Sequence, residues 1–509
     1  MVRRVSDTPL LPLGFDRSSA TPLHRQLYGQ LRDVILAGRL QPGARLPSTR
    51  LIAEEHGLSR NTVTAAFDQL FSEGFIEGRH GSGSYVSRDV PERPSRLPRP
   101  ISGRPTDAAP TVSVRGWELA GSVVVAASER APFAPGVPDS SDFPFEIWAR
   151  LLAKNWRHPS QQLISASDPA GFLPLRQAIA DYLGTVRATR CAASQVIIVS
   201  GARQAVGLAA RVLLDAGDVA WMEEPGFPGV RAALIGAGVK VAPVPVDREG
   251  IDLDAGQQVA PRSRMIVVSP SHQYPLGITM SLPRRLDLLA RARQMRAWIL
   301  EDDYDSEFRY GGRPLAALQG LDEDGRVIYV GSFAKVMFPS MRLGYLVVPA
   351  PLVEVFSRAR AALDDHASTA LQPAQAEFMR LGHFAGHVRR MRKRYAARQE
   401  FLLAAAGELL ADILVLSPDP AGMHLVAGLS PALRRRHDDR AVSAMAGAAG
   451  VVAPALSNYF AGRPTQYGLL LGYAAYAEDQ IGNAVDKLAA TLRPTPSLRR
   501  GSSGSRPGR

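Results

Sequence analysis

One abrupt change in composition constrains the fold of this 509-residue chain more than any other feature. The segment RDVPERPSRLPRPISGRPTDAAP, residues 88–110, is dominated by proline and arginine, and hydrophobic periodicity stops there. Proline-rich stretches of this kind are semi-rigid linkers between domains. We therefore expect a small module over residues 18–87, a linker over 88–112 and a large domain over 113–493.

The two ends of the chain are expected to lie outside both domains. Residues 1–17 form an N-terminal arm without the apolar core of a secretory signal, and residues 494–509 form a basic, low-complexity tail that we expect to be disordered. No apolar run reaches the length of about 18 residues that spans a membrane. The single cysteine, Cys191, excludes an internal disulfide framework and a cysteine-based zinc cluster. Together these features predict a cytoplasmic protein with no membrane partner.

The small module has the pattern of a helix-turn-helix. After a first amphipathic helix within PLHRQLYGQLRDVILAGRL, the stretch LPSTRLIAEEHGLSRNTVTAAFDQLFSEG splits into two short helices. Each is opened by a serine that can cap it, Ser48 or Ser59, and the tight turn HGL separates them. The closing GFIEGRHGSGSYVS is typical of a two-stranded hairpin, with Arg79 and His80 near its glycine-rich tip.

Polar side chains begin the second helix of this pair, while Val63, Phe67 and Leu70 can face the core. Residues at the N-terminal end of a recognition helix contact base edges in the major groove of DNA. A glycine-rich hairpin tip can approach the phosphates closely. The net charge of +12 does not by itself identify a nucleic-acid binder, so the prediction of DNA binding rests on this pattern.

The ordered set RLPSTRLIAEEHGLSRNTVTAAFDQLFSEGFIEGRHGSGSYV resembles the winged helix-turn-helix of GntR-type transcriptional regulators, over nearly all of residues 18–87. The resemblance implies sequence-specific binding to double-stranded DNA. It further implies that the DNA-contacting residues are Arg45, Ser48, Arg50, Arg60, Asn61, Thr62 and Thr64, and that the glycines shaping the wing are Gly81 and Gly83.

The large domain alternates short apolar strands with helical stretches. The strands include QVIIVSG, DVAWME, RMIVVSP, AWILED and RVIYVGS, an alternation typical of a mostly parallel α/β sheet. Polar residues follow several of these strands, at the sheet edge where α/β folds bind ligands. In IIVSGARQAVGLAARVLL, the amides of Gly201 and Ala202 lie at a helix N-terminus that can stabilise an anion.

Lys335, in GSFAKVMFPSMRLGY, is one of five lysines in a chain with 55 arginines. Lysine can lose its proton and form a Schiff base, which arginine cannot. Ser332 and Arg342 beside it are the side-chain types that bind phosphate. Upstream, AWILEDDYDSEF supplies a carboxylate and EEPGFPG an aromatic ring. A reactive amine, a phosphate cup, a carboxylate and a stacking ring are together what pyridoxal 5'-phosphate (PLP) requires.

The order of these features resembles that of fold-type I PLP enzymes over residues 130–492, including SDPAGFLPLRQAIADYL, HVRRMRKRYAARQ and AGMHLVAGL. The resemblance implies that Lys335 forms the Schiff base, that Asp302 holds the pyridine nitrogen, with Asp303 as the competing candidate, and that Phe227 stacks on the ring. It also implies that Tyr304 lies near the phenolic oxygen, with Gln273 or Tyr274 beside it. The implied phosphate-binding residues are Gly201, Ala202, Ser332 and Arg342.

The two halves together resemble the MocR-type (GabR-like) subfamily of GntR regulators. The implied fold is a winged-helix N-terminal domain, largely α-helical, joined to an α/β fold-type I aminotransferase-like domain with a smaller C-terminal subdomain. The implied function is that of a homodimeric regulator that senses a small amine, an amino acid or PLP and controls DNA binding. A working aminotransferase with an accessory DNA-binding domain is the alternative, and a sensor of PLP itself is a third hypothesis.

Three positions depart from the pattern of enzymes that handle amino acids. Ala166 stands where a tyrosine often precedes the DP step, GLLLGY lacks the arginine that grips a substrate carboxylate, and Val336 replaces a Ser or Thr after the lysine. These departures put a standard α-amino-acid pocket in doubt, although Arg203 or Arg231 could supply a carboxylate contact. His383 and His387 lack the glutamate of an H-E-x-x-H motif, so we expect no metal site.

Overall fold

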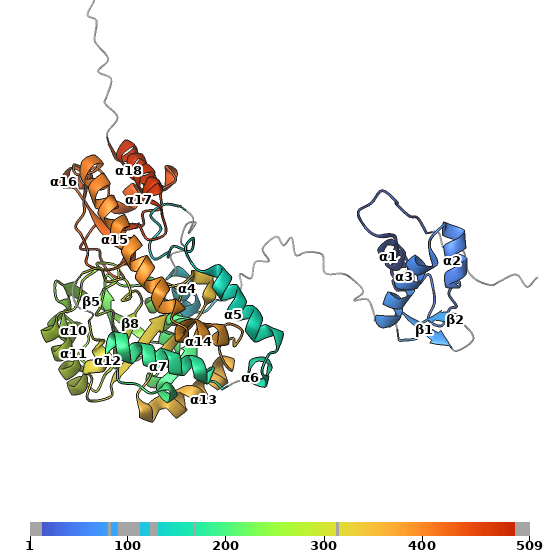
Figure 1. The fold of residues 1–509 in the computed structure, drawn as a ribbon, viewed down its shortest axis with the longest axis horizontal. Helices are drawn as coiled ribbons and strands as arrows, with labels where there is room; N and C mark the ends of the chain where they lie inside the picture. Colours follow the sequence, from blue (N-terminus) through green and yellow to red (C-terminus); the bar gives the residue numbers. More distant parts are fainter. Residues whose placement is uncertain are drawn as a thin grey trace, which may run out of the picture. The chain divides into compact units, whose positions relative to one another are not determined.

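The computed structural model of the chain describes residues 13–79, 83–89, 112–122, 131–165, 168–311 and 315–493. The chain divides into two compact units, Met1–Thr111 and Val112–Arg509 (Figure 1). The sequence predictions for residues 1–12, His80, Gly81, Ala166, the tail 494–509 and nearly all of the linker lie outside the described residues.

The small unit is a winged helix-turn-helix. Its elements are α1 (Leu23–Leu36), α2 (Thr49–His56), α3 (Arg60–Ser72), β1 (Ile76–Arg79) and β2 (Gly83–Val86). The predicted serine caps are confirmed, because Ser48 accepts from the amide of Leu51 and Ser59 from that of Thr62. The two strands pair antiparallel as the wing, and the predicted core residues Val63, Phe67 and Leu70 are buried.

The large unit is built on an eight-stranded sheet with the order β3-β10-β9-β8-β7-β4-β5-β6. Its strands are β3 (Val196–Val199), β4 (Val219–Glu224), β5 (Lys240–Asp247), β6 (Gly250–Ile251), β7 (Met265–Val268), β8 (Trp298–Asp303), β9 (Val327–Ser332) and β10 (Gly344–Val347). The strands from β9 to β5 pair parallel, whereas β10 runs antiparallel to both of its neighbours and β6 to β5. The predicted mostly parallel sheet is therefore confirmed.

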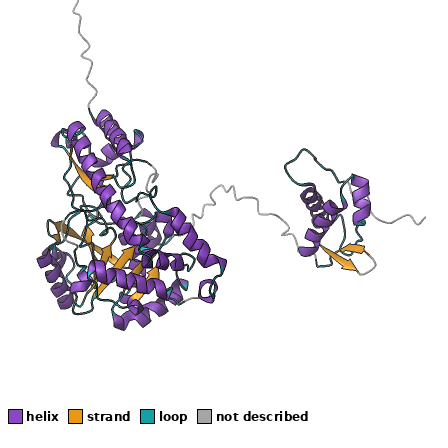
Figure 2. Ribbon diagram, in the orientation of Figure 1, coloured by secondary structure: helices purple, strands orange, loops and turns teal. Residues whose placement is uncertain are grey.

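Helices pack on the faces of this sheet and on one another (Figure 2). The helices up to the C-terminal subdomain are α4 (Val114–Gly121), α5 (Phe145–Arg157), α6 (Gln161–Ile164), α7 (Leu173–Arg187), α8 (Ala202–Leu213), α9 (Pro228–Gly236), α10 (Leu253–Val259), α11 (Leu282–Met295), α12 (Leu318–Leu321), α13 (Val353–Asp364) and α14 (Gln372–Arg380). Buried strands such as β3, with every residue inside, read as continuous apolar runs because helices pack on both faces. Short 3₁₀ turns cover Ala193–Gln195, Pro339–Met341, Ala350–Leu352 and Leu456–Tyr459.

A smaller C-terminal subdomain follows the sheet in sequence, with the long helix α15 (His383–Leu409) leading into it (Figure 1). It contains an antiparallel sheet of β11 (Leu414–Val415), β12 (His424–Leu429) and β13 (Gly468–Gly472), with α16 (Pro431–Arg434), α17 (Asp439–Ala448) and α18 (Glu478–Leu492). Phe133, far upstream in the sequence, pairs with Gly472 at the edge of this sheet. Within the described residues, no helix combines the length and the apolar character needed to cross a membrane.

The carboxyl ends of five strands converge at one edge of the large sheet. The predicted cofactor residues follow β3, β4, β7, β8 and β9, whose ends lie at this common edge. Gly344 of β10 lies opposite both Val199 and Ser332 in the ladder. A Cβ at Gly344 would come within 3.0 Å of the Gly201 Cα, so glycine is what allows these chain segments to approach.

Candidate functional site

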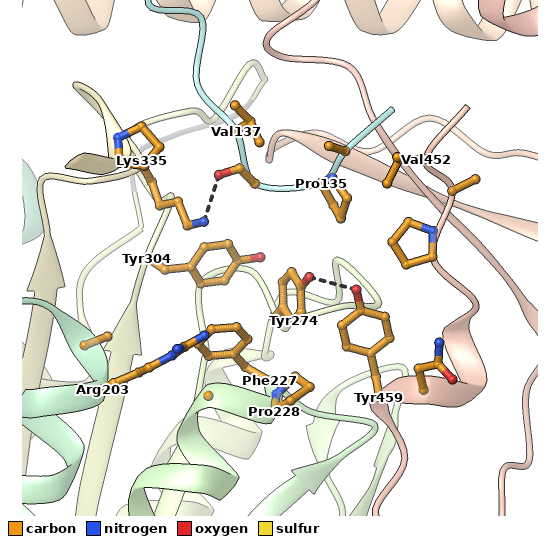
Figure 3. A pocket seen from close by; sticks show the side chains of 18 of the residues that line it. Pro135, Val137, Arg203, Phe227, Pro228, Tyr274, Tyr304, Lys335, Val452 and Tyr459 are labelled. Atoms are coloured by element: carbon orange, nitrogen blue, oxygen red, sulfur yellow. Dashed lines mark hydrogen bonds between the residues drawn. The ribbon is translucent and has the colours of Figure 1, made fainter. Parts of the chain in front are cut away.

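A cavity of about 460 Å³ lies at this carboxyl edge, between the large sheet and the C-terminal subdomain. The sheet side contributes Phe227, Tyr274, Asp302, Tyr304 and Lys335 to its lining, and the subdomain contributes residues 451–454, Asn458 and Tyr459. Figure 3 shows Val452 and Tyr459 across the cavity from Lys335. One side of the cavity therefore consists of residues predicted from the sequence. The opposite side consists of subdomain residues that were not predicted.

The Lys335 amine points into the cavity and donates a hydrogen bond to the backbone oxygen of Gly136, over 2.8 Å (Figure 3). Gly136 has a φ of +70°, and a Cβ there would lie 2.7 Å from the Lys335 Nζ. Glycine at this position thus leaves room for the amine. The segment FAPGVPD, residues 133–139, carries no motif that predicts a site, although its Pro-Gly step indicates a tight turn.

Strand alternation separates the two candidate carboxylates, Asp302 and Asp303. Asp302 lines the cavity, and no described residue donates a hydrogen bond to its side chain. Asp303 is turned the other way, where it pairs with the Arg187 guanidinium at 2.9 Å and accepts from the Ser306 hydroxyl at 2.8 Å. Burial, together with the neighbouring carboxylates, raises the pKa of Asp302 to about 7. The Lys335 amine, in the same cavity, acts in the opposite direction and lowers this pKa, but burial and the neighbouring carboxylates outweigh it.

Aromatic rings form much of the cavity surface (Figure 3). Phe227 and Tyr274 meet edge to face with centroids 5.6 Å apart, and the Tyr274 hydroxyl donates to that of Tyr459 at 3.4 Å. Tyr304 reaches the cavity from the end of β8, and its hydroxyl lies 2.9 Å from the His272 Nδ1. Such rings can contact a planar ligand on its face and supply polar atoms at its edge.

An anion-binding corner lies where α8 begins. Gly201 caps this helix with a φ of +120°, and Ala202, Arg203 and Ser332 line the adjoining part of the cavity. The amides of a first helical turn have no partners within the helix, and the helix dipole favours a negative charge there. Arg203 adds a guanidinium 5.8 Å from the centre of the Phe227 ring.

Three predicted cofactor residues do not line the cavity: Gly201, which caps α8 beside it, Gln273 and Arg342. The Gln273 side chain donates to the backbone oxygens of Pro225 and Tyr274 and accepts from the Leu276 amide, so its amide is fully occupied by backbone groups. The sequence left Gln273 and Tyr274 open as alternatives, and the geometry favours Tyr274. Arg342 is exposed, with a left-handed backbone at φ +47°, and therefore remains only a predicted phosphate ligand.

These residues fit PLP in both chemistry and position. The cavity brings together a lysine amine, a buried carboxylate, an aromatic ring and a helix N-terminus, each contributed by a different strand end. A pyridinium nitrogen would donate a hydrogen bond to the Asp302 carboxylate, which receives none from the described residues, and a phosphate would meet the amides at the start of α8. No group of three or more His, Cys, Asp or Glu residues suited to hold a metal occurs within the described part of the chain.

The predicted DNA-contacting residues lie on the surface of the small unit. Arg45, Ser48, Arg50, Arg60, Asn61 and Thr64 are exposed. Thr62 is half-buried, and its hydroxyl hydrogen-bonds to that of Ser59 at 2.8 Å. Arg50 forms an exposed ion pair with Glu54, at 3.0 Å. Arg45 pairs by its backbone with Tyr85 of the wing, and its guanidinium lies near Gly83.

Known protein families match both the small and the large unit of this chain. Residues 137–488 match the aminotransferase class I and II family, and residues 23–86 match the gntR family of bacterial regulatory proteins. The chain is 42% identical to the probable rhizopine catabolism regulatory protein MocR of Rhizobium meliloti, over 94% of this chain and 96% of that protein. It is 30% identical to the pyridoxine biosynthesis transcriptional regulator PdxR of Corynebacterium glutamicum, over 92% and 96%.

Among solved structures, the large unit is similar to LysN, an α-aminoadipate aminotransferase from Thermus thermophilus solved with N-(5'-phosphopyridoxyl)-L-leucine. The TM-score is 0.65 and the identity 26%, over 75% of this chain and 94% of that one. A winged helix-turn-helix and an aminotransferase-type cofactor cavity thus occur on one chain. The MocR regulator is similar to this chain over nearly its whole length. The chain belongs to the MocR-type subfamily of GntR transcriptional regulators: it is a DNA-binding regulator whose aminotransferase-like domain binds pyridoxal phosphate.

Proposed function

We propose that this regulator senses a small primary amine through PLP held at Lys335 and that ligand occupancy changes its affinity for an operator. The observation that carries the proposal is the meeting of the Lys335 amine, the buried Asp302 carboxylate and the α8 N-terminus in one cavity. The same chain carries exposed arginines at the start of a recognition helix.

Each cavity residue has a separate part in this proposal. When bound, PLP supplies an aldehyde that condenses with amines. Lys335 provides the protein's own amine, Asp302 holds the ring nitrogen protonated, and Phe227 packs against the ring face. Ala202 and Ser332 bind the phosphate, with Gly201 shaping the turn, while Tyr274 and Tyr304 offer hydroxyls to the ring's polar edge. The roles of Gln273 and Arg342 are the least supported by their positions.

The wall opposite Lys335 suggests what the effector carries besides its amine. Residues 451–454 present two valines, an alanine and a proline to the cavity. The cationic side chains in the described lining are Lys335 and Arg203, and Arg203 lies at the anion corner beside Phe227. We call residues 451–454 the valine wall. An effector carboxylate buried against it would lose its hydration without gaining a cationic partner there. The effector therefore ends in a neutral group on this side.

Leucine and isoamylamine form a matched pair for this point, because they differ only in the carboxylate. We expect isoamylamine to change the visible spectrum of the PLP-loaded protein at a concentration at least about tenfold lower, a difference of ~1.4 kcal/mol. Equal potency of the two, or a preference for leucine, would contradict the neutral wall.

The central experiment combines absorbance with DNA binding. PLP-loaded wild type is expected to show a visible cofactor band that Lys335→Ala lacks, and an operator selected from random DNA should bind with amine-dependent affinity. Lys335→Arg is the matched control, since it retains a cation but cannot form the covalent bond. Absence of the band from PLP-treated wild type would refute the cofactor's role at Lys335.

A working aminotransferase is the second candidate, because solved structures similar to the large unit are aminotransferases. This activity would give turnover of an amino acid and keto acid pair at about 1 per second or faster. Failure to select any specific DNA site, together with such turnover, would favour the enzyme.

We also propose a homodimer that reads two half-sites, either direct or inverted, as dimeric helix-turn-helix proteins do. This proposal is supported by the chain's membership of the MocR-type subfamily, because the resemblance to that subfamily implies a homodimer. Sedimentation of the free and DNA-bound protein checks the stoichiometry, and a monomer bound to a single half-site would contradict it.

A further inference from the structure

A buried cluster of charged groups lies directly behind the cavity. The His272 ring stands between two carboxylates, with Nδ1 3.0 Å from Asp305 and Nε2 3.3 Å from Asp419. His272 is 2% exposed and Asp305 1% exposed. His424 packs against the same ring, with centroids 5.9 Å apart. None of the cofactor roles assigned above uses this cluster.

The geometry defines the protonation of His272. Each ring nitrogen faces a carboxylate oxygen at hydrogen-bonding distance, so both nitrogens must carry hydrogens and the ring is a cation. Burial opposes this charge, but the carboxylates of Asp305 and Asp419 outweigh it and raise the pKa of His272 to about 10. His424 is the neutral neighbour, since burial and the charge of His272 lower its pKa and its Nε2 bonds to the Pro275 oxygen.

The cation also reaches Tyr304. Its Nδ1 lies 2.9 Å from the Tyr304 hydroxyl and 3.0 Å from the Asp305 carboxylate, so the single Nδ1 hydrogen is shared between them and the hydroxyl oxygen accepts. Among the described residues, no other group hydrogen-bonds to this hydroxyl. The hydroxyl's own hydrogen is therefore free to point into the cavity that Tyr304 lines. Accepting a charge-assisted hydrogen bond also makes a phenol a stronger donor.

Two glycines with positive φ make room for this arrangement. A Cβ at Gly422 would lie 2.2 Å from the His272 Cε1, and one at Gly277 would lie 2.0 Å from the Asp419 carboxylate. The imidazole is thus confined to one position between its partners. Asp419 lies in the segment between β11 and β12 of the C-terminal subdomain, whereas Asp305 follows β8 of the large sheet. His272 therefore connects the two parts of the large unit.

We propose that His272 is a positioning residue that orients the Tyr304 hydroxyl as a donor toward the bound cofactor and links that hydroxyl, through Asp419, to the C-terminal subdomain. This inference rests on the proposed cofactor site, because Tyr304 acts there on the ring's polar edge. It goes beyond that site by giving the subdomain a direct hydrogen-bonded path to the cofactor. The spectrum of the cofactor then reports the subdomain's position.

The test is a pH titration of the visible cofactor band in full-length, PLP-loaded protein. His272→Asn removes the ring cation, and we expect the titration midpoint to rise by about one pH unit, the scale of a lost charge-assisted hydrogen bond. Asp419→Asn should move it in the same direction by less. Asp438→Asn is the matched control, because this exposed subdomain carboxylate caps α17 through the Ala441 amide and does not contact His272.

A double-mutant cycle distinguishes positioning from a general electric field. If His272 acts through Tyr304, His272→Asn should cause no further shift in a Tyr304→Phe background. An equal shift in both backgrounds, or no shift in wild type, overturns the inference while leaving the cofactor site intact. Failure of wild type to form the band would instead refute the proposed function. If His272→Asn does not fold, Asp419→Asn in the two backgrounds gives the same comparison.

Discussion

Two adjacent carboxylates on one strand have different environments and different roles in this protein. Asp302 and Asp303 follow each other at the end of β8, yet one faces the cavity without a hydrogen-bond donor and the other is neutralised by Arg187. Both were candidates from the sequence, and the spacing to Lys335 favoured Asp302. Only the alternation of side chains along β8, fixed by its pairing with β7 and β9, separates their roles.

Replacing these two residues should therefore have opposite consequences. Asp302→Asn should weaken PLP binding about tenfold or more while stabilising the PLP-free protein by roughly 1 to 3 kcal/mol, because it removes a buried charge that accepts no hydrogen bond from the described residues. Asp303→Asn should destabilise the fold by about 3 to 5 kcal/mol, because it leaves Arg187 buried without a partner. Urea unfolding and PLP titration of both variants measure these effects. Equal losses of stability would contradict the assignment.

Gly136 provides a second test at this scale. Gly136→Ala should slow cofactor incorporation, because the new Cβ would lie 2.7 Å from the Lys335 Nζ on a backbone with positive φ. Gly382→Ala is the control, since Gly382 has a similar φ of +78° and no neighbouring atom within 4 Å. We expect similar stability losses of roughly 1 kcal/mol in both variants, but a changed rate of band formation only for Gly136→Ala. Equal rates would contradict the close contact.

Some site residues could not be identified from the sequence. His272 and Asp419 are far apart in the chain, and their pairing depends on where the C-terminal subdomain packs. Gln273 resembled a cofactor contact because it follows β7, but its side chain supports the backbone at Pro225 and Leu276 instead. Local spacing can place a residue at a strand end, but it cannot say which groups compete for its hydrogen bonds.

At the scale of elements, strand order explains why the cofactor site could be predicted. Each motif directly follows a strand, and parallel strands bring their carboxyl ends to one edge whatever their order in the sheet. The valine wall of residues 451–454 does not follow a strand of the large sheet, so no sequence motif marks it. It belongs to the C-terminal subdomain and reaches the cavity only through tertiary packing.

The recognition helix α3 yields a prediction of its own. Arg60→Ala should weaken binding to the selected operator by about 1 to 3 kcal/mol and relax preference at one base position, because Arg60 is exposed in the first turn. Arg32→Ala is the control on α1, where Arg32 pairs with Asp33. Gel shifts with the operator and with scrambled DNA separate the two effects. An unchanged base preference would contradict the placement of the recognition surface.

At the scale of the whole molecule, the carboxyl edge of the sheet concentrates buried acids. Burial raises the pKa of Glu223 to about 8, and those of Asp302, Glu301 and Glu307 to about 7. The folded state therefore binds more protons than the unfolded chain between their ordinary pKa values, near 4, and these raised values. Stability contributed by these groups must fall as the pH rises through this window.

We expect the PLP-free protein to lose stability steadily from about pH 5 to pH 8, and PLP to reduce the slope because the ring nitrogen pairs with Asp302. Urea unfolding at half-unit pH intervals, with and without PLP, measures both slopes. Asp302→Asn should show the reduced slope without PLP. Stability that rises with pH over this range would contradict the raised pKa values of these buried acids.

The pairing of Phe133 with Gly472 has a consequence for how the protein is made. Ribosomes deliver the N-terminal end of a chain first, and domains fold as units when they emerge. The winged helix can fold early, but the cofactor cavity needs both the segment at Gly136 and the late residues 451–459. During synthesis, therefore, a nascent chain gains the surface that contacts DNA before it gains the pocket that controls it, and cofactor capture marks a chain whose translation has passed β13.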